Sequence, residues 1–100
     1  MLNSRQRAQL RGMANTMDTI VQIGKNGITE SVTAQVSDAL RARELVKGRV
    51  LENADMTPRG AAEELSRLCL AEPVQVIGTR FVLYKENREI PKDKRIRLVK

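Results

Sequence analysis

The sequence has no histidine and a single cysteine, and its only aromatic residues are Phe81 and Tyr84. Without histidine, a two-metal site or a serine–histidine pair would need other ligands or bases, and no carboxylate cluster supplies them. The lone Cys69 cannot form an internal disulfide, which is typical of a reducing compartment. Catalysis therefore has no candidate residues, and we expect neither enzyme activity nor a metal nor a cofactor.

Long apolar runs are also missing. No segment approaches the about 20 apolar residues that cross a bilayer, and the start, "MLNSRQRAQLRG", lacks an apolar signal core. We expect a cytoplasmic protein with no membrane partner. The scarcity of aromatics disfavours an RRM, which needs several of them to stack bases. Phe81 and Tyr84 are expected to pack in the core.

The charge balance is the strongest signal in the composition. Eighteen lysines and arginines stand against 12 acids, which gives a net charge of +6 and an isoelectric point near 10.1. A small basic domain attracts polyanions, with nucleic acid first and an anionic membrane surface second. The alternative is a charge that only keeps the protein soluble. One hundred residues, 41% of them hydrophobic, suit one folded domain.

The hydrophobic pattern predicts the order α-β-α-β-α-β-β. We expect a helix capped by Ser4 that ends near residue 15, with Met13 on its apolar face, and a strand at 19–23. Thr29 caps the next helix, and residues 44–52 form a strand. Gly48 weakens this strand and marks either a bulge or a close backbone approach. These units predict a small mixed sheet packed with helices, a single compact α/β domain.

The second half of the pattern is a helix and a hairpin. Thr57 caps the helix, Pro58 takes its first position, and Leu68 belongs to its apolar stripe. Residues 73–85 predict two strands joined by a type II′ turn at Gly78 and Thr79. The basic tail, residues 86–100, would either add an edge strand at "RIRLV" or stay mobile.

Gly24, Lys25, Asn26 and Gly27 lie between a strand and a capped helix. This is neither a hairpin, since no second strand follows, nor a Walker loop or dinucleotide fingerprint. Glycines let a backbone approach a ligand, the first amides of a helix lack partners, and the helix dipole and Lys25 add positive charge. The turn could therefore bind a sugar-phosphate chain, as a GXXG loop does in KH domains. The alternative is a plain turn.

Other basic residues extend this prediction. Arg5 and Arg7 in the first turn of the first helix, with Arg11 one turn later, oppose the helix dipole, which a phosphate partner would explain. Lys47 and Arg49 alternate along their strand with valines, so part of that face must be open to water. In both places the alternative is an ordinary solvated surface.

Together, "IVQIGKNGITESV", "ALRARELVKGRVLEN" and "EPVQVIGTRFVLYK" closely resemble the YhbY-type CRM domain over residues 2–99. The resemblance implies the fold of the C-terminal domain of a bacterial translation initiation factor, and RNA binding. It further implies association with large ribosomal subunit precursors, as for stand-alone bacterial members; plant relatives act in organellar intron splicing. Gly24–Gly27 match the family's GXXG loop and Lys47 its basic strand residue, whereas Gly48 replaces an expected β-branched residue.

These lines predict a non-catalytic protein that binds ribosomal RNA during assembly of the large subunit, through Gly24–Gly27 and a basic surface. We expect a monomer, with ribosomal proteins as further partners. A protein-interaction adaptor with incidental RNA contact is the alternative, and a nuclease is disfavoured.

Overall fold

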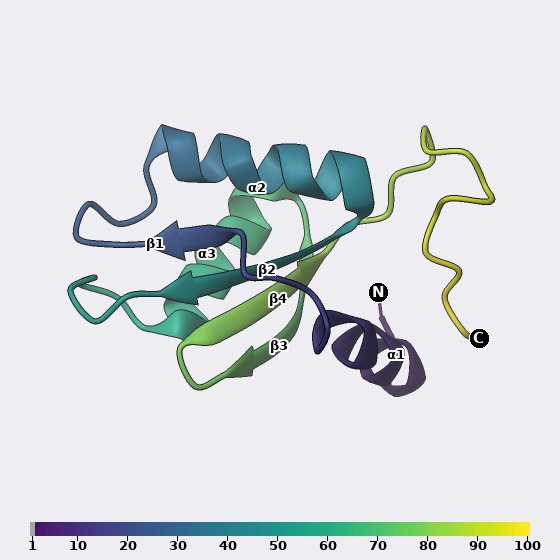
Figure 1. Ribbon diagram of the computed structural model, residues 1–100, viewed down its shortest axis with the longest axis horizontal. Helices are drawn as coiled ribbons and strands as arrows, with labels where there is room; N and C mark the ends of the chain where they lie inside the picture. The colour runs from purple at the N-terminus through teal and green to yellow at the C-terminus, as the bar shows by residue number, and fades with distance from the viewer. Residues whose placement is uncertain (1) are drawn as a thin grey trace.

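The computed structural model describes residues 2–100 and confirms the predicted element order (Figure 1). The elements are α1 (Ser4–Ala14), β1 (Val21–Ile23), α2 (Glu30–Arg43), β2 (Leu45–Val50), α3 (Pro58–Cys69), β3 (Glu72–Ile77) and β4 (Arg80–Tyr84). No helix within residues 2–100 is long and apolar enough to cross a membrane.

The helix caps follow from local side-chain chemistry. Thr29 and Thr57 cap α2 and α3 as predicted. The predicted cap at Ser4 is wrong, because Asn3 takes that position. The Asn3 side chain accepts the Gln6 amide, and the Gln6 side chain accepts the Asn3 amide. This reciprocal capping box satisfies two of the amides that a helix start leaves free.

The four strands form one mixed sheet in the order β1-β2-β4-β3. The β1–α2–β2 crossover makes parallel neighbours. The β2–α3–β3 crossover does not, because β4 lies between β2 and β3 and pairs antiparallel with both. Gly78 has φ +58° and Thr79 a negative φ, which is the pattern of the predicted type II′ turn.

Two apolar clusters hold the layers together. α2 and α3 pack on one face of the sheet, where Phe81 is fully buried, and α1 packs on part of the other face, where Tyr84 is buried. Both aromatic predictions are confirmed, and burial, with nearby carboxylates, raises the pKa of Tyr84 to about 12. Met13 and Leu68 were predicted to face the core but are 40% and 43% exposed, because each helix buries only a narrow stripe.

The ring of Phe81 explains why residue 48 is a glycine. A Cβ at this position would lie 2.3 Å from Cζ of Phe81, and two further ring atoms would lie within 3 Å. The Phe81 ring therefore occupies the space that a β-branched residue would need. Of the two roles expected for Gly48, the close approach is confirmed, with this buried ring as the partner. A bulge is not observed, because the register runs through Gly48 without a shift.

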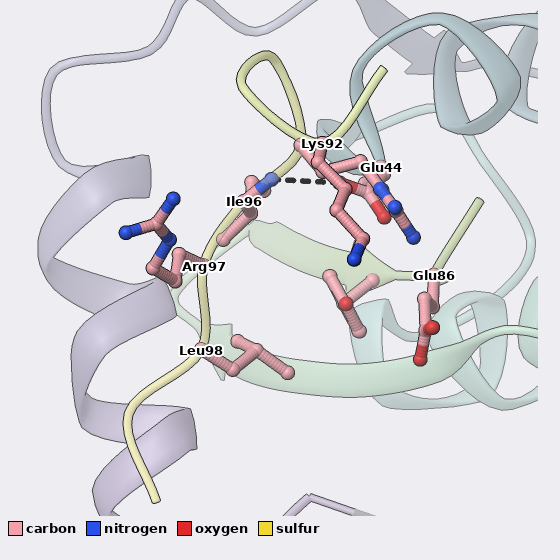
Figure 2. A pocket seen from close by; sticks show the side chains of 8 residues that line it. Glu44, Glu86, Lys92, Ile96, Arg97 and Leu98 are labelled. Atoms are coloured by element: carbon pink, nitrogen blue, oxygen red, sulfur yellow. Dashed lines mark hydrogen bonds between the residues drawn. The ribbon is translucent and has the colours of Figure 1, made fainter. Parts of the chain in front are cut away.

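The C-terminal tail, residues 86–100, contacts the rest of the domain through the buried carboxylate of Glu44. Glu44 ends α2 with φ +65°, so the strand predicted from residue 44 begins one residue later. Its Oε2 accepts the Asn87 amide at 2.7 Å and its Oε1 accepts the Ile96 amide at 2.8 Å. Figure 2 shows the Ile96–Glu44 hydrogen bond among the residues that line a cavity, with Arg97 lying toward α1. The cavity has a volume of about 290 Å³.

The far end of the tail lies against α1, where the side chain of Gln9 bonds to both the Val99 amide and the Arg97 carbonyl. Residues 95–99 bond to the Gln9 side chain and form no strand. The edge strand predicted there is therefore wrong.

Candidate nucleic-acid interface

Residues 24–27 form a tight turn at the end of the sheet where β1 stops (Figure 1). The Gly27 amide donates to the Gly24 carbonyl at 3.0 Å, and Gly27 has φ +69°. Lys25 and Asn26 keep negative φ, the pattern of a type I turn with glycine at its fourth position. Both are exposed, and no residue between 2 and 100 accepts a hydrogen bond from their amides. Two backbone donors of this exposed turn therefore have no acceptor within the described residues.

The start of α2 adds further donors. Oγ1 of Thr29 accepts the Val32 amide at 3.2 Å, and the Thr33 amide donates to the Thr29 carbonyl. The amides of Glu30 and Ser31 have no such partner within the described chain. Free amides at a helix start and the helix dipole favour an anion. The exposed Glu30 carboxylate, in the same first turn, competes for that field.

The structure separates the predicted basic residues into groups. Lys25 belongs to the loop after β1, which lies at the same end of the molecule as the loop after β2 (Figure 1). Arg5 and Arg11 lie on α1, toward the other end of a molecule whose longest dimension is 39 Å (Figure 1). Both arginines are exposed, but they do not join the turn in one compact site.

Arg7 and Lys47 make contacts that the sequence did not reveal. Nη1 of Arg7 donates to the Pro73 carbonyl on β3, and Nζ of Lys47 donates to the Ala14 carbonyl at 3.1 Å. Both side chains are half-buried and tie α1 to the sheet. Part of their charge therefore serves the fold, although each retains further donors.

Arg49 lies one pleat beyond Lys47 on the sheet face that α1 covers only in part. The alternation is as predicted, because Val46 and Val50 point into the opposite core cluster. Arg49 is half-buried, and its Nε atom is buried without a hydrogen-bond partner. Among residues 2–100, no carboxylate forms an ion pair with this arginine.

Sequence reasoning missed Arg80, the first residue of β4. It pairs directly with Arg49 across the antiparallel strands. The hairpin signal placed Arg80 at a strand start, but only the β2–β4 register, decided by the tertiary structure, brings it beside Arg49. Among residues 2–100, no three His, Cys, Asp or Glu side chains gather to hold a metal ion.

Residues 2–85 match the model of the CRS1 / YhbY (CRM) domain family. The chain belongs to the CRM domain family. This confirms the resemblance that the sequence motifs carried. The structural prediction of a compact mixed α/β domain is confirmed with it, because the same order of helices and strands is observed.

Curated relatives of this CRM domain carry RNA binding in their names. The chain is 39% identical to "Probable RNA-binding protein YqeI" of Bacillus subtilis, over 89% of this chain and 93% of that protein. It is 34% identical to an "RNA-binding protein" of Haemophilus influenzae, over 88% and 89% of the two chains. The solution structure of the hypothetical protein SAV1595 from Staphylococcus aureus superposes with a TM-score of 0.79 and 41% identity, covering 99% of this chain and 100% of that one.

Proposed function

We propose that this CRM-domain protein is a non-catalytic, cytoplasmic RNA-binding protein that contacts ribosomal RNA on large-subunit precursors during ribosome assembly. The observation that carries the proposal is the turn at residues 24–27, where unpaired amides of Lys25 and Asn26 lie beside an exposed ammonium and a helix start. The names of the relatives support RNA as the ligand.

The turn suits a phosphate chain for a steric reason as well. No atom lies within 4 Å of the position that a Cβ would take at Gly27, so a sugar-phosphate backbone can approach its main chain. The only two aromatic residues are buried in the core. RNA bases therefore cannot stack on these aromatic rings, and recognition depends on contacts to phosphates and on RNA shape.

Electrostatics sets the expected salt dependence. If Lys25, Arg5, Arg11 and Arg49 each contact one phosphate, the slope of log K against log salt is about −3 to −4. A salt-independent affinity would contradict this part of the proposal. Arg7 and Lys47 are expected to add less, since each already donates to a backbone carbonyl.

Binding to transcribed fragments of large-subunit ribosomal RNA, measured by fluorescence anisotropy, tests the turn. Lys25→Glu combined with Gly27→Asp should abolish binding, while the circular dichroism spectrum stays unchanged. Lys25→Gln should weaken binding by about two- to fivefold, the effect of 0.3–1 kcal/mol. Lys85→Gln removes the same charge from an exposed position after β4 and should change nothing. Full affinity in the folded double variant would contradict the turn contact.

The ribosomal target needs a separate experiment. Crosslinking in cells, followed by sequencing of the attached RNA, should recover precursors of the large subunit. Reads spread over messenger RNAs would contradict the assembly role while leaving RNA binding intact.

A protein-interaction adaptor is the second candidate, and one observation favours it. Leu70 ends α3 with φ +55° and is 79% exposed, although glycine or asparagine usually occupies such a position. An exposed leucine in a strained conformation could anchor a protein of the ribosome. Leu70→Asn should then release that partner, identified by pull-down from ribosomal particles, without weakening RNA binding.

Sedimentation should show the free protein as a monomer.

A further inference from the structure

One row of side chains crosses all four strands on the face opposite α2 and α3. The strand register places Gln22 beside Arg49, Arg49 beside Arg80, and Arg80 beside Ile77. We call these four residues the end row. The neighbouring strand residues, such as Ile23 and Phe81, point into the opposite core cluster. Ile77 is 62% exposed and Arg80 is exposed, so α1 does not cover this part of the face.

The two arginines of the end row are like charges placed directly opposite each other, an arrangement that destabilises a bare sheet. The ion pairs of the described chain are Asp38–Arg41, Glu64–Arg67 and Glu86–Arg88. None involves Arg49 or Arg80, and the end row holds no acid. The buried Nε of Arg49 also lacks an acceptor. An anion between the two guanidinium groups would remove the repulsion and let Arg49 turn toward an acceptor.

An open cavity of about 550 Å³ continues from Arg49 toward the turn at residues 24–27. It is lined by Arg49, Val50, Leu51, Glu52, Asn53 and Thr79. Leu51 and Asn53 also flank Gly24, with side-chain atoms 3.7 and 3.8 Å from the position of a Cβ there. The cavity therefore borders Gly24 through Leu51 and Asn53 and the arginine pair through Arg49. Its volume lies in the range of small-molecule sites.

We propose that Arg49 and Arg80 together bind one phosphate of the RNA strand that passes over residues 24–27, and that the adjoining unpaired nucleotide enters the cavity. This inference rests on the proposed function and adds Arg80, a phosphate site and a preference for single-stranded RNA. Guanidinium groups suit phosphate because their planar forks donate two parallel hydrogen bonds. A base held in a duplex could not enter the cavity, because it would have to leave its stack.

The test compares Arg80→Gln, Lys25→Gln and Arg88→Gln, each of which removes one positive charge. Arg88 is the control, because it is exposed and pairs with Glu86 in the tail. The probes are a labelled single-stranded RNA of about 12 nucleotides and a duplex RNA of the same length. Arg80→Gln should weaken single-strand binding about tenfold and make the salt slope shallower by about 1. Arg88→Gln should do neither.

Nuclear magnetic resonance gives a second readout. The Arg49 Nε–H signal should shift when the single-stranded RNA is added, and Arg80→Gln should reduce that shift. Thermal unfolding should show that Arg80→Gln is at least as stable as the wild type, because it relieves the opposed charges. If Arg80→Gln destabilised the protein, the conclusion that Arg49 and Arg80 repel each other in the free protein would be wrong.

The outcomes separate this site from the turn. If Lys25→Gln weakens binding and Arg80→Gln does not, the arginine site is wrong and the turn contact stands. If the wild type binds neither RNA, the proposed function itself fails. Equal affinity for duplex and single-stranded RNA would overturn the claim that an unpaired nucleotide enters the cavity. A polyglutamate peptide that shifts the Arg49 signal as RNA does would identify an acidic protein segment as the ligand.

Discussion

Gly48 offers the sharpest test of how the strand that carries Lys47 and Arg49 is built. Gly48→Ala would place a Cβ 2.3 Å from Cζ of Phe81, where ordinary contact begins at 3.4 Å. The ring edge must therefore retreat by about 1 Å, but Phe81 is fully buried in the core cluster that the sheet forms with α2 and α3. Overpacking of this kind costs about 1–3 kcal/mol, and alanine regains about 0.5–1 kcal/mol over glycine in a strand.

The midpoints of these two ranges leave a net loss of about 1 kcal/mol, which lowers the melting temperature by roughly 4–8 °C in a domain of this size. Thermal and urea unfolding followed by circular dichroism measure it. Gly12→Ala is the matched control, since nothing lies within 4 Å of its Cβ position on α1. This change should stabilise the protein by up to about 1 kcal/mol.

A double-mutant cycle identifies the cause. Phe81→Leu removes the ring atoms that Gly48→Ala would meet. The double variant should therefore lose less unfolding free energy than the two single variants lose together, by about 0.5–3 kcal/mol. Strictly additive losses, or a Gly48→Ala protein as stable as the wild type, would refute the reasoning that the Phe81 ring excludes a side chain at this position.

Two further predictions concern charge. Glu44→Gln keeps one acceptor oxygen but sets an NH2 donor against the amide of either Asn87 or Ile96, a loss of about 1–3 kcal/mol. Hydrogen exchange at those two amides should accelerate about five- to hundredfold, while exchange at the Phe81 amide should not change. Unchanged exchange at both amides would contradict the conclusion that Glu44 holds the tail. Glu30→Gln removes the carboxylate beside the turn and should tighten RNA binding by about two- to fivefold at low salt. Glu63→Gln is its control on α3, and equal effects of the two would show that only net charge matters.

The candidate site was predictable from sequence where local chemistry decides. A glycine at the fourth turn position and a threonine that accepts an amide three residues ahead are short-range features, so residues 24–29 could be placed correctly. The role of Gly48 in its strand was only half predictable, because a close approach requires a partner, and Phe81 comes from a strand 33 residues later in the chain. The cap of α1 was misplaced because Asn3 and Ser4 are both good capping residues.

By itself the sequence determined the order of the elements, the caps of α2 and α3, the hairpin turn and the motifs of the CRM family. Each of these depends on residues within a few positions of one another. Only the tertiary structure decided that Arg7 and Lys47 tie α1 to the sheet, that Glu44 holds the tail, and that Arg80 lies beside Arg49. These contacts join segments tens of residues apart, and strand order and register, which no local pattern encodes, bring them together.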